Sequence, residues 1–358
     1  MRNLITNINE SDENYVFSPI AVYYALCLLA QTTAGETKRE ILDVLNVSED
    51  ELLSRANIIH DAFNEGEILS LNSSLWLNNA HRFNEDAIEQ IGIDNNSTIE
   101  IGYMGVKEFD DKLHDWLNKN TGGLLKDNVD GISFTGDTLM ELFSAIYLKG
   151  SWADHFNKNE TSFKTFHVDD SNEVECEFMN RTLSDVVLIG EKFKAVKLHI
   201  VGIGTMSFIL PNEGYAPNDI RDDEELVSFI AGREDCLTRG MFNINLSLPK
   251  FDVKADGDLL TQLKKLGIRK AMDMYEADFS IISDEKDLCL AKANQASRIK
   301  IDENGIEAAS YVEMAVLMKG IPFMAETEID MIFDRPFMFV VERERMPLFV
   351  GTITNPNE

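Results

Sequence analysis

The spacing of apolar residues changes near Leu139, and this change limits the possible folds more than any other feature of the sequence. Before it, apolar residues recur at three- and four-residue intervals, which is typical of helices with one buried face. Four segments show the pattern or are almost wholly apolar: residues 20–30, 36–45, 49–63 and 109–118. The first of them follows Ser18-Pro19, a favourable helix start. We therefore expect the first third of the chain to be helical.

After Leu139 the chain consists mainly of short apolar runs that are typical of β-strands. The first, residues 142–148 (LFSAIYL), is almost continuous and predicts a strand covered on both faces. Similar runs occupy residues 186–188, 195–200, 206–210, 242–248, 288–291, 298–301, 329–333, 337–341 and 348–353. Only residues 258–266 return to helical spacing. Helices followed by strands predict an α+β fold with a large, mostly antiparallel or mixed sheet. Because no Pro-, Gly- or Ser-rich linker occurs, we expect one domain over residues 1–358.

Charge and hydropathy exclude several classes of function. The 358 residues include 33 Lys+Arg and 62 Asp+Glu, so the net charge of −29 opposes binding to nucleic acid. No run of 18 apolar residues is present, so we expect no transmembrane helix. The first residues lack the parts of a signal peptide. A cytoplasmic location, secretion by a route without a signal, and secretion after removal of a signal are all compatible with this N-terminus.

Common enzyme and metal-site motifs are missing from the sequence. There is no GxSxG, HExxH, Walker A or GxGxxG motif. The four cysteines, Cys27, Cys176, Cys236 and Cys289, form no CxxC pair, and no two of the six histidines have helical metal-ligand spacing. We therefore expect a protein that is not an enzyme and that has no metal site and no cofactor. Cys289 is expected in a strand of the sheet, and not as a nucleophile.

Residues 302–334 fit neither the helical nor the strand pattern. They have no stable period, and loops this long in compact domains are usually functional or disordered. Read with a period of two, residues 306–316 have one wholly uncharged face: Ile306, Ala308, Ser310, Val312, Met314 and Val316. The opposite face carries Glu307 and Glu313, so the segment is competent to form a half-buried strand. An amphipathic helix or an ordinary edge strand is the alternative from this segment alone.

Motifs spread over nearly the whole chain resemble those of the serpin family. VFSP at residues 16–19 and TAGET at 33–37 resemble the serpin shutter and its following helix, and DWLNKNTGG at 115–123 is similar to the family's W-x-x-x-x-T-x-G segment. AIYLKGSW at 145–152 resembles the end of the third strand of sheet A, with Trp152 at the breach. Further matches are LP at 210–211, LPKF at 248–251, KLGI at 265–268, DRPF at 334–337, LFVG at 348–351 and NP at 355–356.

The resemblance implies a fold and a set of functional residues. The serpin fold has a helix-rich N-terminal part, a large central mixed sheet A, two further sheets and an exposed reactive-centre loop, here at about residues 303–333. The implied hinge comprises Glu303, Gly305, Ile306, Glu307, Ala308, Ala309 and Ser310. The implied shutter and breach comprise Ser18, Ser144, Trp152 and Gln295. Counting from Gly305 by the family's usual distance gives a reactive bond at Lys319-Gly320, with Met318, Phe323 and Met324 as alternatives.

The sequence departs from the serpin pattern in three ways. Ile306 stands where a small hydroxyl residue is usual, and its branched side chain is stiff. Ser144 and Gln295 stand where Asn and His are expected, so a polar shutter network would have different partners. The loop is also several residues longer than usual. These departures affect the expected rate of inhibition more than the expected fold.

The resemblance implies a suicide-substrate inhibitor of serine proteases. Loop cleavage would let the loop insert into the central sheet while the protease is held as a covalent acyl complex. Lys319 favours a trypsin-like target. The alternatives are chymotrypsin-like, cathepsin-G-like or cysteine proteases, or a non-inhibitory serpin that acts as a carrier, chaperone or storage protein. The uncharged face of residues 306–316 favours inhibition.

Other partners are not expected. We expect a monomer that binds neither nucleic acid nor membranes. Residues 49–63 correspond to the helix that binds heparin in some serpins, and Arg55 is their only basic residue apart from neutral His60. Heparin binding through this helix is therefore not expected.

Overall fold

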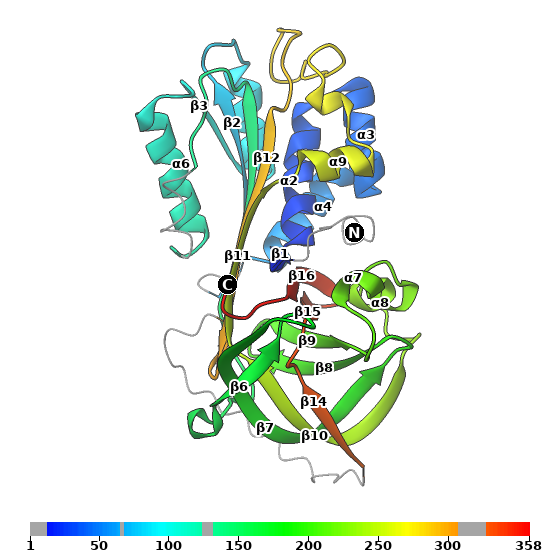
Figure 1. The fold of residues 1–358 in the computed structure, drawn as a ribbon. Helices are drawn as coiled ribbons and strands as arrows, with labels where there is room; N and C mark the ends of the chain where they lie inside the picture. Colours follow the sequence, from blue (N-terminus) through cyan, green and yellow to red (C-terminus); the bar gives the residue numbers. More distant parts are fainter. Residues whose placement is uncertain (1–12, 65–67, 124–131, 307–326) are drawn as a thin grey trace.

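The computed structural model describes residues 13–64, 68–123, 132–306 and 327–358. In these residues the chain forms a seven-stranded sheet flanked by helices and a nine-stranded sheet that fills most of the other half of the molecule (Figure 1). The helices are α2 (Pro19–Thr32), α3 (Gly35–Leu45), α4 (Glu49–Ala62), α5 (Glu85–Asp94), α6 (Lys107–Asn120), α7 (Pro217–Ile220), α8 (Glu224–Ile230) and α9 (Leu260–Leu266), with 3-10 turns at Lys158–Glu160 and Lys270–Met272. None of the described helices is long and apolar enough to cross a membrane.

Helix α2 is the central helix of the N-terminal part. The Ser18 hydroxyl accepts a hydrogen bond from the Ala21 N–H (3.2 Å) and Pro19 lies in the first turn, which explains where the helix begins. Every residue of α2 except Gln31 is buried, as its apolar composition predicts. The expected helices at 20–30, 36–45, 49–63, 109–118 and 258–266 are confirmed as α2, α3, α4, α6 and α9.

The seven-stranded sheet contains neighbours that are far apart in the sequence. Its order is β3 (Thr98–Gly102), β2 (Leu69–Asn78), β4 (Met140–Leu148), β12 (Lys292–Asp302), β13 (Gly305–Ile306) and β5 (Gly150–Ser151), and β11 (Phe251–Asp258) pairs with β12. Helix α6 lies on one side of this sheet, and α2, α3, α4 and α9 lie on the other (Figure 1). Burial on both sides explains why β4 is a nearly continuous apolar run.

The remaining strands form one nine-stranded sheet. Its order is β1 (Tyr15–Phe17), β16 (Met346–Ile353), β15 (Phe337–Arg343), β9 (Gly204–Pro211), β8 (Phe193–Ile200), β7 (Glu173–Ile189), β10 (Thr238–Pro249) and β14 (Glu328–Ile332), and β6 (Ser162–His167) pairs with β7. The predicted α+β class with a mixed sheet is thus confirmed. The two further sheets that the resemblance implies are joined into this one sheet. The reason is that β7, at 17 residues, is long enough to pair with β6, β8 and β10.

Two local predictions were wrong. The first third of the chain is not wholly helical, because it also contains β2 and β3. The sequence of β2, LSLNSSLWLN, carried a visible signal, since its leucines mostly recur at every second position. Residues 288–291 form no strand, and Cys289 therefore lies in an irregular segment ahead of β12. Leu288 and Leu290 are buried there. The apolar run at 288–291 therefore reflects burial of these side chains and not strand geometry.

Candidate functional site

The seven-stranded sheet is joined over a short length between β4 and β12. These strands are parallel and pair over five residue pairs, from Glu141 with Lys292 to Ala145 with Ala296. Beyond Ala145, β4 continues on β2 and β12 continues on β11, and within the described residues the two strands no longer pair with each other. We call the line between β4 and β12 the seam. Another strand could enter the sheet here while breaking few ladder hydrogen bonds.

The predicted hinge lies at the open end of the seam. After β12 the chain reverses at Glu303-Asn304 and returns as β13. Asp302 stabilises the turn, because its Oδ1 accepts hydrogen bonds from the N–H groups of Asn304 (2.7 Å) and Gly305 (3.3 Å). β13 pairs with the end of β12 on one side and with β5 on the other. Ile306 is buried in this position, with 1% of its surface exposed.

Gly305 is required by a close approach of two backbones. A Cβ atom at this position would lie 2.1 Å from the Gly150 carbonyl oxygen of β5. Its φ of 155° also favours glycine. Sequence reasoning assigned Gly305 to the hinge because of its conformational freedom, and the structure adds that any larger residue would push β13 away from β5.

Glu303 anchors the hinge turn to the body of the protein. Its side chain is buried, and its Oε1 accepts a hydrogen bond from the Thr161 hydroxyl (2.8 Å) and lies 3.5 Å from Lys250 Nζ. Burial by itself raises the pKa of Glu303, but the Thr161 hydrogen bond and the Lys250 charge outweigh burial and lower the pKa below its ordinary value. Sequence reasoning missed both partners, although Lys250 belongs to the LPKF motif that it singled out.

Trp152 holds the same turn through two further hydrogen bonds. Its indole Nε1–H donates to the Asp302 carbonyl (2.9 Å), and its backbone N–H donates to the Asn304 carbonyl (2.9 Å). The ring is buried and packs near Phe156 and Phe208, at centroid distances of 6.5 and 6.3 Å. The chain on either side of Glu303 is therefore held by one aromatic residue, whose place in a breach stays a prediction from the family resemblance.

The predicted shutter residues come together in the paired part of the seam, one residue pair before β4 and β12 separate. The Gln295 amide accepts from the Ser18 N–H (2.8 Å) and donates to the Ser18 carbonyl (3.0 Å), and it lies at 3.5 Å from the Ser144 hydroxyl. All three residues are buried. Gln295 on β12 thus binds the start of α2 tightly and β4 only weakly, which leaves little polar restraint across the seam at this point.

Part of the predicted site lies outside the described residues. These are the hinge residues Glu307, Ala308, Ala309 and Ser310 and the reactive-bond candidates Lys319, Gly320, Met318, Phe323 and Met324. Their roles stay predictions from the sequence.

Replacing Glu303 with Gln should lower the melting temperature of the intact protein, and the loss should depend on pH. Because the folded-state pKa lies below the ordinary value of 4.5, ionised Glu303 stabilises the fold above about pH 4.5, and this contribution is lost as the pH falls through the lowered pKa. Thermal scans should therefore show a difference between wild type and variant that is largest near neutral pH and shrinks in acid. Glu89→Gln, on exposed α5 surface, is the matched control. A melting-temperature difference that is equal at neutral and at acid pH would contradict the charge-based account.

Comparisons with known proteins match this architecture. The family model described as serpin (serine protease inhibitor) matches residues 2–356. An alpha-1-antitrypsin-like protein from Tamias sibiricus is 28% identical over 96% of this chain and 84% of its own length, and alpha-1-antiproteinase 2 from Equus caballus is 27% identical over 96% and 82%.

Solved structures share the fold at lower sequence identity. Human thyroxine-binding globulin, in complex with thyroxine, superposes with a TM-score of 0.82 at 21% identity, over 100% of this chain and 96% of that one. Serpin48 from the insect Tenebrio molitor, described as a highly specific serpin, gives 0.80 at 21% identity, over 99% and 95%. The native thermophilic serpin tengpin gives 0.82 at 22%, over 99% and 92%. By the match of the family model to residues 2–356, the chain belongs to the serpin family.

Proposed function

We propose that this serpin inhibits serine proteases as a suicide substrate, and that its cleaved loop inserts along the seam between β4 and β12. The observation that carries the proposal is the seam itself: five residue pairs join the two strands, and β13 already lies at its open end. The antiproteinase names of its relatives support the same class of function.

The energetics of strand insertion favour this mechanism. A loop strand inserted between β4 and β12 would break the short parallel pairing of these two strands. In return it would pair with β4 along one edge and with β12 along the other. It would gain on the order of ten ladder hydrogen bonds, each worth about 1 kcal/mol net. This total is comparable with the stability of a whole domain, about 5–15 kcal/mol. The uncut protein would therefore be metastable and kinetically trapped. The contacts of Glu303 and Trp152 at the turn would contribute to the activation barrier that opposes loop insertion.

The experiment that tests inhibition is covalent complex formation. The intact protein is mixed with a panel of trypsin-like, chymotrypsin-like and cathepsin-G-like serine proteases and with cysteine proteases, and the products are separated by denaturing electrophoresis. We expect a complex that survives denaturation with at least one serine protease. Complete loop cleavage by all of them without any such complex would overturn the proposal.

Within this proposal, Lys319 is the residue that selects the protease. It is the only Lys or Arg between Lys300 and Arg335. Lys319→Ala should slow complex formation with a trypsin-like protease by about 100-fold, because the acidic specificity pocket is left with an unpaired charge. Lys119→Ala, on the exposed surface of α6, is the control. Mass spectrometry of the released C-terminal peptide should show a fragment that begins at Gly320. A fragment that begins at Lys319, Met324 or Ala325 would instead move the reactive residue to Met318, Phe323 or Met324.

A non-inhibitory role is the second candidate. One observation favours it, the similarity in fold to thyroxine-binding globulin, which was solved in complex with thyroxine. A serpin of this kind would serve as a carrier, chaperone or storage protein. The electrophoresis experiment separates the two candidates, since a non-inhibitory serpin is cut without trapping the protease.

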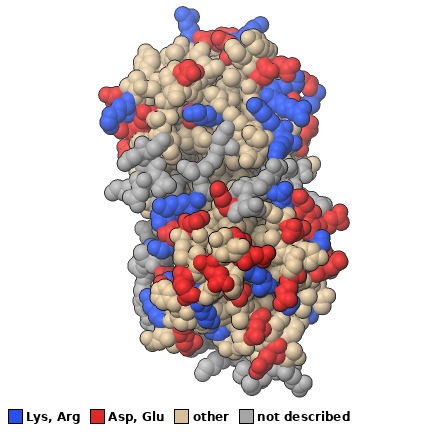
Figure 2. Space-filling model, viewed as in Figure 1, with Lys and Arg blue, Asp and Glu red and all other residues tan. Residues whose placement is uncertain are grey.

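We further propose that the protein acts without heparin. On the face drawn in Figure 2, acidic side chains are spread over the lower half, and Lys and Arg gather over α3 and α9. Three basic side chains of α3 and the Lys270–Met272 turn have acidic partners in the structure: Lys38 with Glu49 (2.6 Å), Arg39 with Glu36 (2.5 Å) and Lys270 with Glu276 (3.2 Å). A polyanion would have to compete with these carboxylates and with the net charge of −29.

A further inference from the structure

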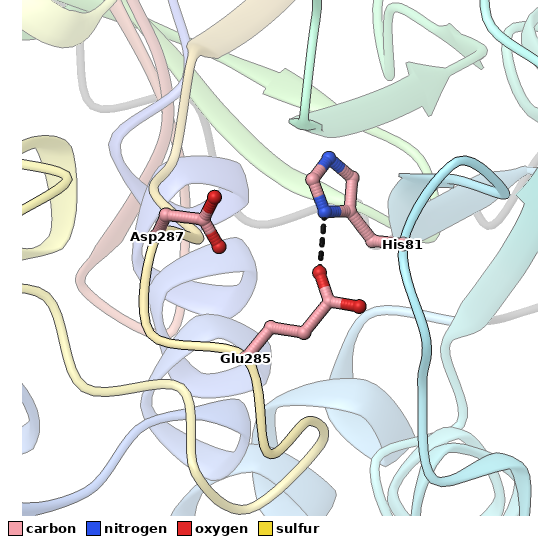
Figure 3. Close-up of side chains that lie close together, drawn as sticks. All are labelled: His81, Glu285 and Asp287. Atoms are coloured by element: carbon pink, nitrogen blue, oxygen red, sulfur yellow. Dashed lines mark hydrogen bonds and ion pairs between the residues drawn. The ribbon is translucent and has the colours of Figure 1, made fainter.

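Three side chains with metal-binding atoms meet at the far end of the seam from the hinge. His81 follows β2, whereas Glu285 and Asp287 lie on the segment that leads into β12 (Figure 3). One potential ligand atom from each lies within 4.8 Å of the other two. His81 Nδ1 and Glu285 Oε2 are 2.6 Å apart, although 204 positions separate the two residues in the sequence. Sequence spacing could not reveal such a group.

The group has a chemistry suited to a divalent transition metal. One imidazole and two carboxylates carry a charge of about −2 when the imidazole is neutral, and Zn²⁺ binds such nitrogen and oxygen ligands together with a water molecule. Donor atoms around tetrahedral zinc lie about 3.3 Å apart. The 2.6 Å hydrogen bond would have to lengthen slightly, and the exposed Asp287 would have to rotate. Within the described residues the Asp287 carboxylate makes no hydrogen bond or ion pair that would oppose this rotation.

The neighbouring contacts hold Glu285 and the backbone next to His81 in place. Glu285 Oε1 accepts a hydrogen bond from the Arg82 N–H (2.9 Å), which leaves Oε2 directed at His81. The Ser283 hydroxyl donates to the Arg82 carbonyl (2.5 Å) and accepts from the Glu285 N–H (3.1 Å). Outer contacts of this kind orient metal ligands before the metal arrives.

The group also crosses the line along which the sheet would open. His81 lies three residues after the end of β2, and β2 is paired with β4 along its length. Glu285 and Asp287 lead into β12, on the other side of the seam. A strand inserted between β4 and β12 moves them apart by about 4.8 Å. Hydrogen bonds between the two segments can be exchanged for water, but metal–ligand bonds of about 2.1 Å cannot stretch to follow that movement.

We propose that His81, Glu285 and Asp287 form a site for a divalent transition-metal ion such as Zn²⁺, and that the bound ion clamps the two sides of the seam and restrains loop insertion. The second part rests on the proposed function. By linkage, an ion that opposes insertion binds the inserted form more weakly than the intact form, by the same factor.

Binding is tested by calorimetric titration of intact protein with Zn²⁺. All proteins carry Cys236→Ser, because Cys236 is an exposed free thiol and thiolates are zinc ligands in their own right. We expect one site that His81→Ala or Asp287→Asn weakens by at least tenfold. His167→Ala is the matched control, since His167 also pairs with a glutamate, Glu173, at 3.0 Å but without a second carboxylate in the group. Equal zinc affinity in wild type, His81→Ala and Asp287→Asn would overturn the site.

The clamp is tested by repeating the titration on protein whose loop has been cut. Insertion is first verified by a rise in the melting temperature. We then expect zinc affinity at least tenfold lower than in the intact form. If the cut protein gains heat stability and binds zinc equally well, the clamp is wrong while the proposed function stands. If cutting brings no gain in stability, insertion itself fails, and the titration of the intact protein still decides the metal site.

Discussion

Cutting the loop within residues 307–326 should raise the melting temperature of the protein by about 20 °C or more. The reason is that a loop strand in the seam adds on the order of ten ladder hydrogen bonds, or about 10 kcal/mol, and in a chain of this size 1 kcal/mol corresponds to roughly 2 °C. The five pairs that now join β4 and β12 are few enough to be exchanged for this gain.

The measurement is a thermal scan of intact and cut protein at one scan rate, because serpin-sized chains often unfold irreversibly. The control sample is intact protein incubated under the same conditions with inactivated protease. A melting temperature that cutting leaves unchanged would show that the loop does not insert, and the inhibitory proposal would lose its driving force.

The second large effect is expected from Ala308→Arg. Strand alternation from the buried Ile306 puts position 308 on the inward face of an inserted strand, so an unpaired charge would be buried there at a cost of about 3–5 kcal/mol. We expect insertion to slow by more than 100-fold, so that the protease cuts the variant and escapes. The share of protease trapped as covalent complex on a denaturing gel measures this.

Ala309→Arg is the matched control for this variant. The same side chain is added one position further along, on the face that would point to solvent. Trapping should be nearly normal in Ala309→Arg and nearly absent in Ala308→Arg. The reverse result would mean that the inserted strand has the opposite register. Equal trapping by both variants would mean that insertion does not depend on which face of the strand carries the charge.

The sequence predicted those elements whose local pattern records burial. α2, α6 and β4 were found because apolar spacing depends on which face of an element is covered, and that spacing is visible along the chain itself. β2 was missed although its leucines recur at alternate positions, a pattern that is typical of a strand and visible in the sequence. Residues 288–291 were misassigned for a physical reason, since a short apolar run can be buried without being a strand.

For the candidate site, sequence reasoning found residues but not their relations. Gly305, Glu303, Trp152 and Gln295 were named from motifs. That Gln295 binds the Ser18 backbone and barely reaches Ser144, and that Glu303 meets Thr161, follow only from the packed structure. Single-chain periodicity carries no information about which distant polar groups satisfy one another after folding.

The sequence by itself determined the types of elements, their order and, through its motifs, the family. The tertiary structure decided how short the seam is, that β13 lies at its open end, and that His81 meets Glu285 and Asp287. These features depend on how segments up to 204 positions apart are placed relative to one another. That placement is set by the free energy of the whole packed chain, whereas the spacing of residues reports only on the local face that each element buries.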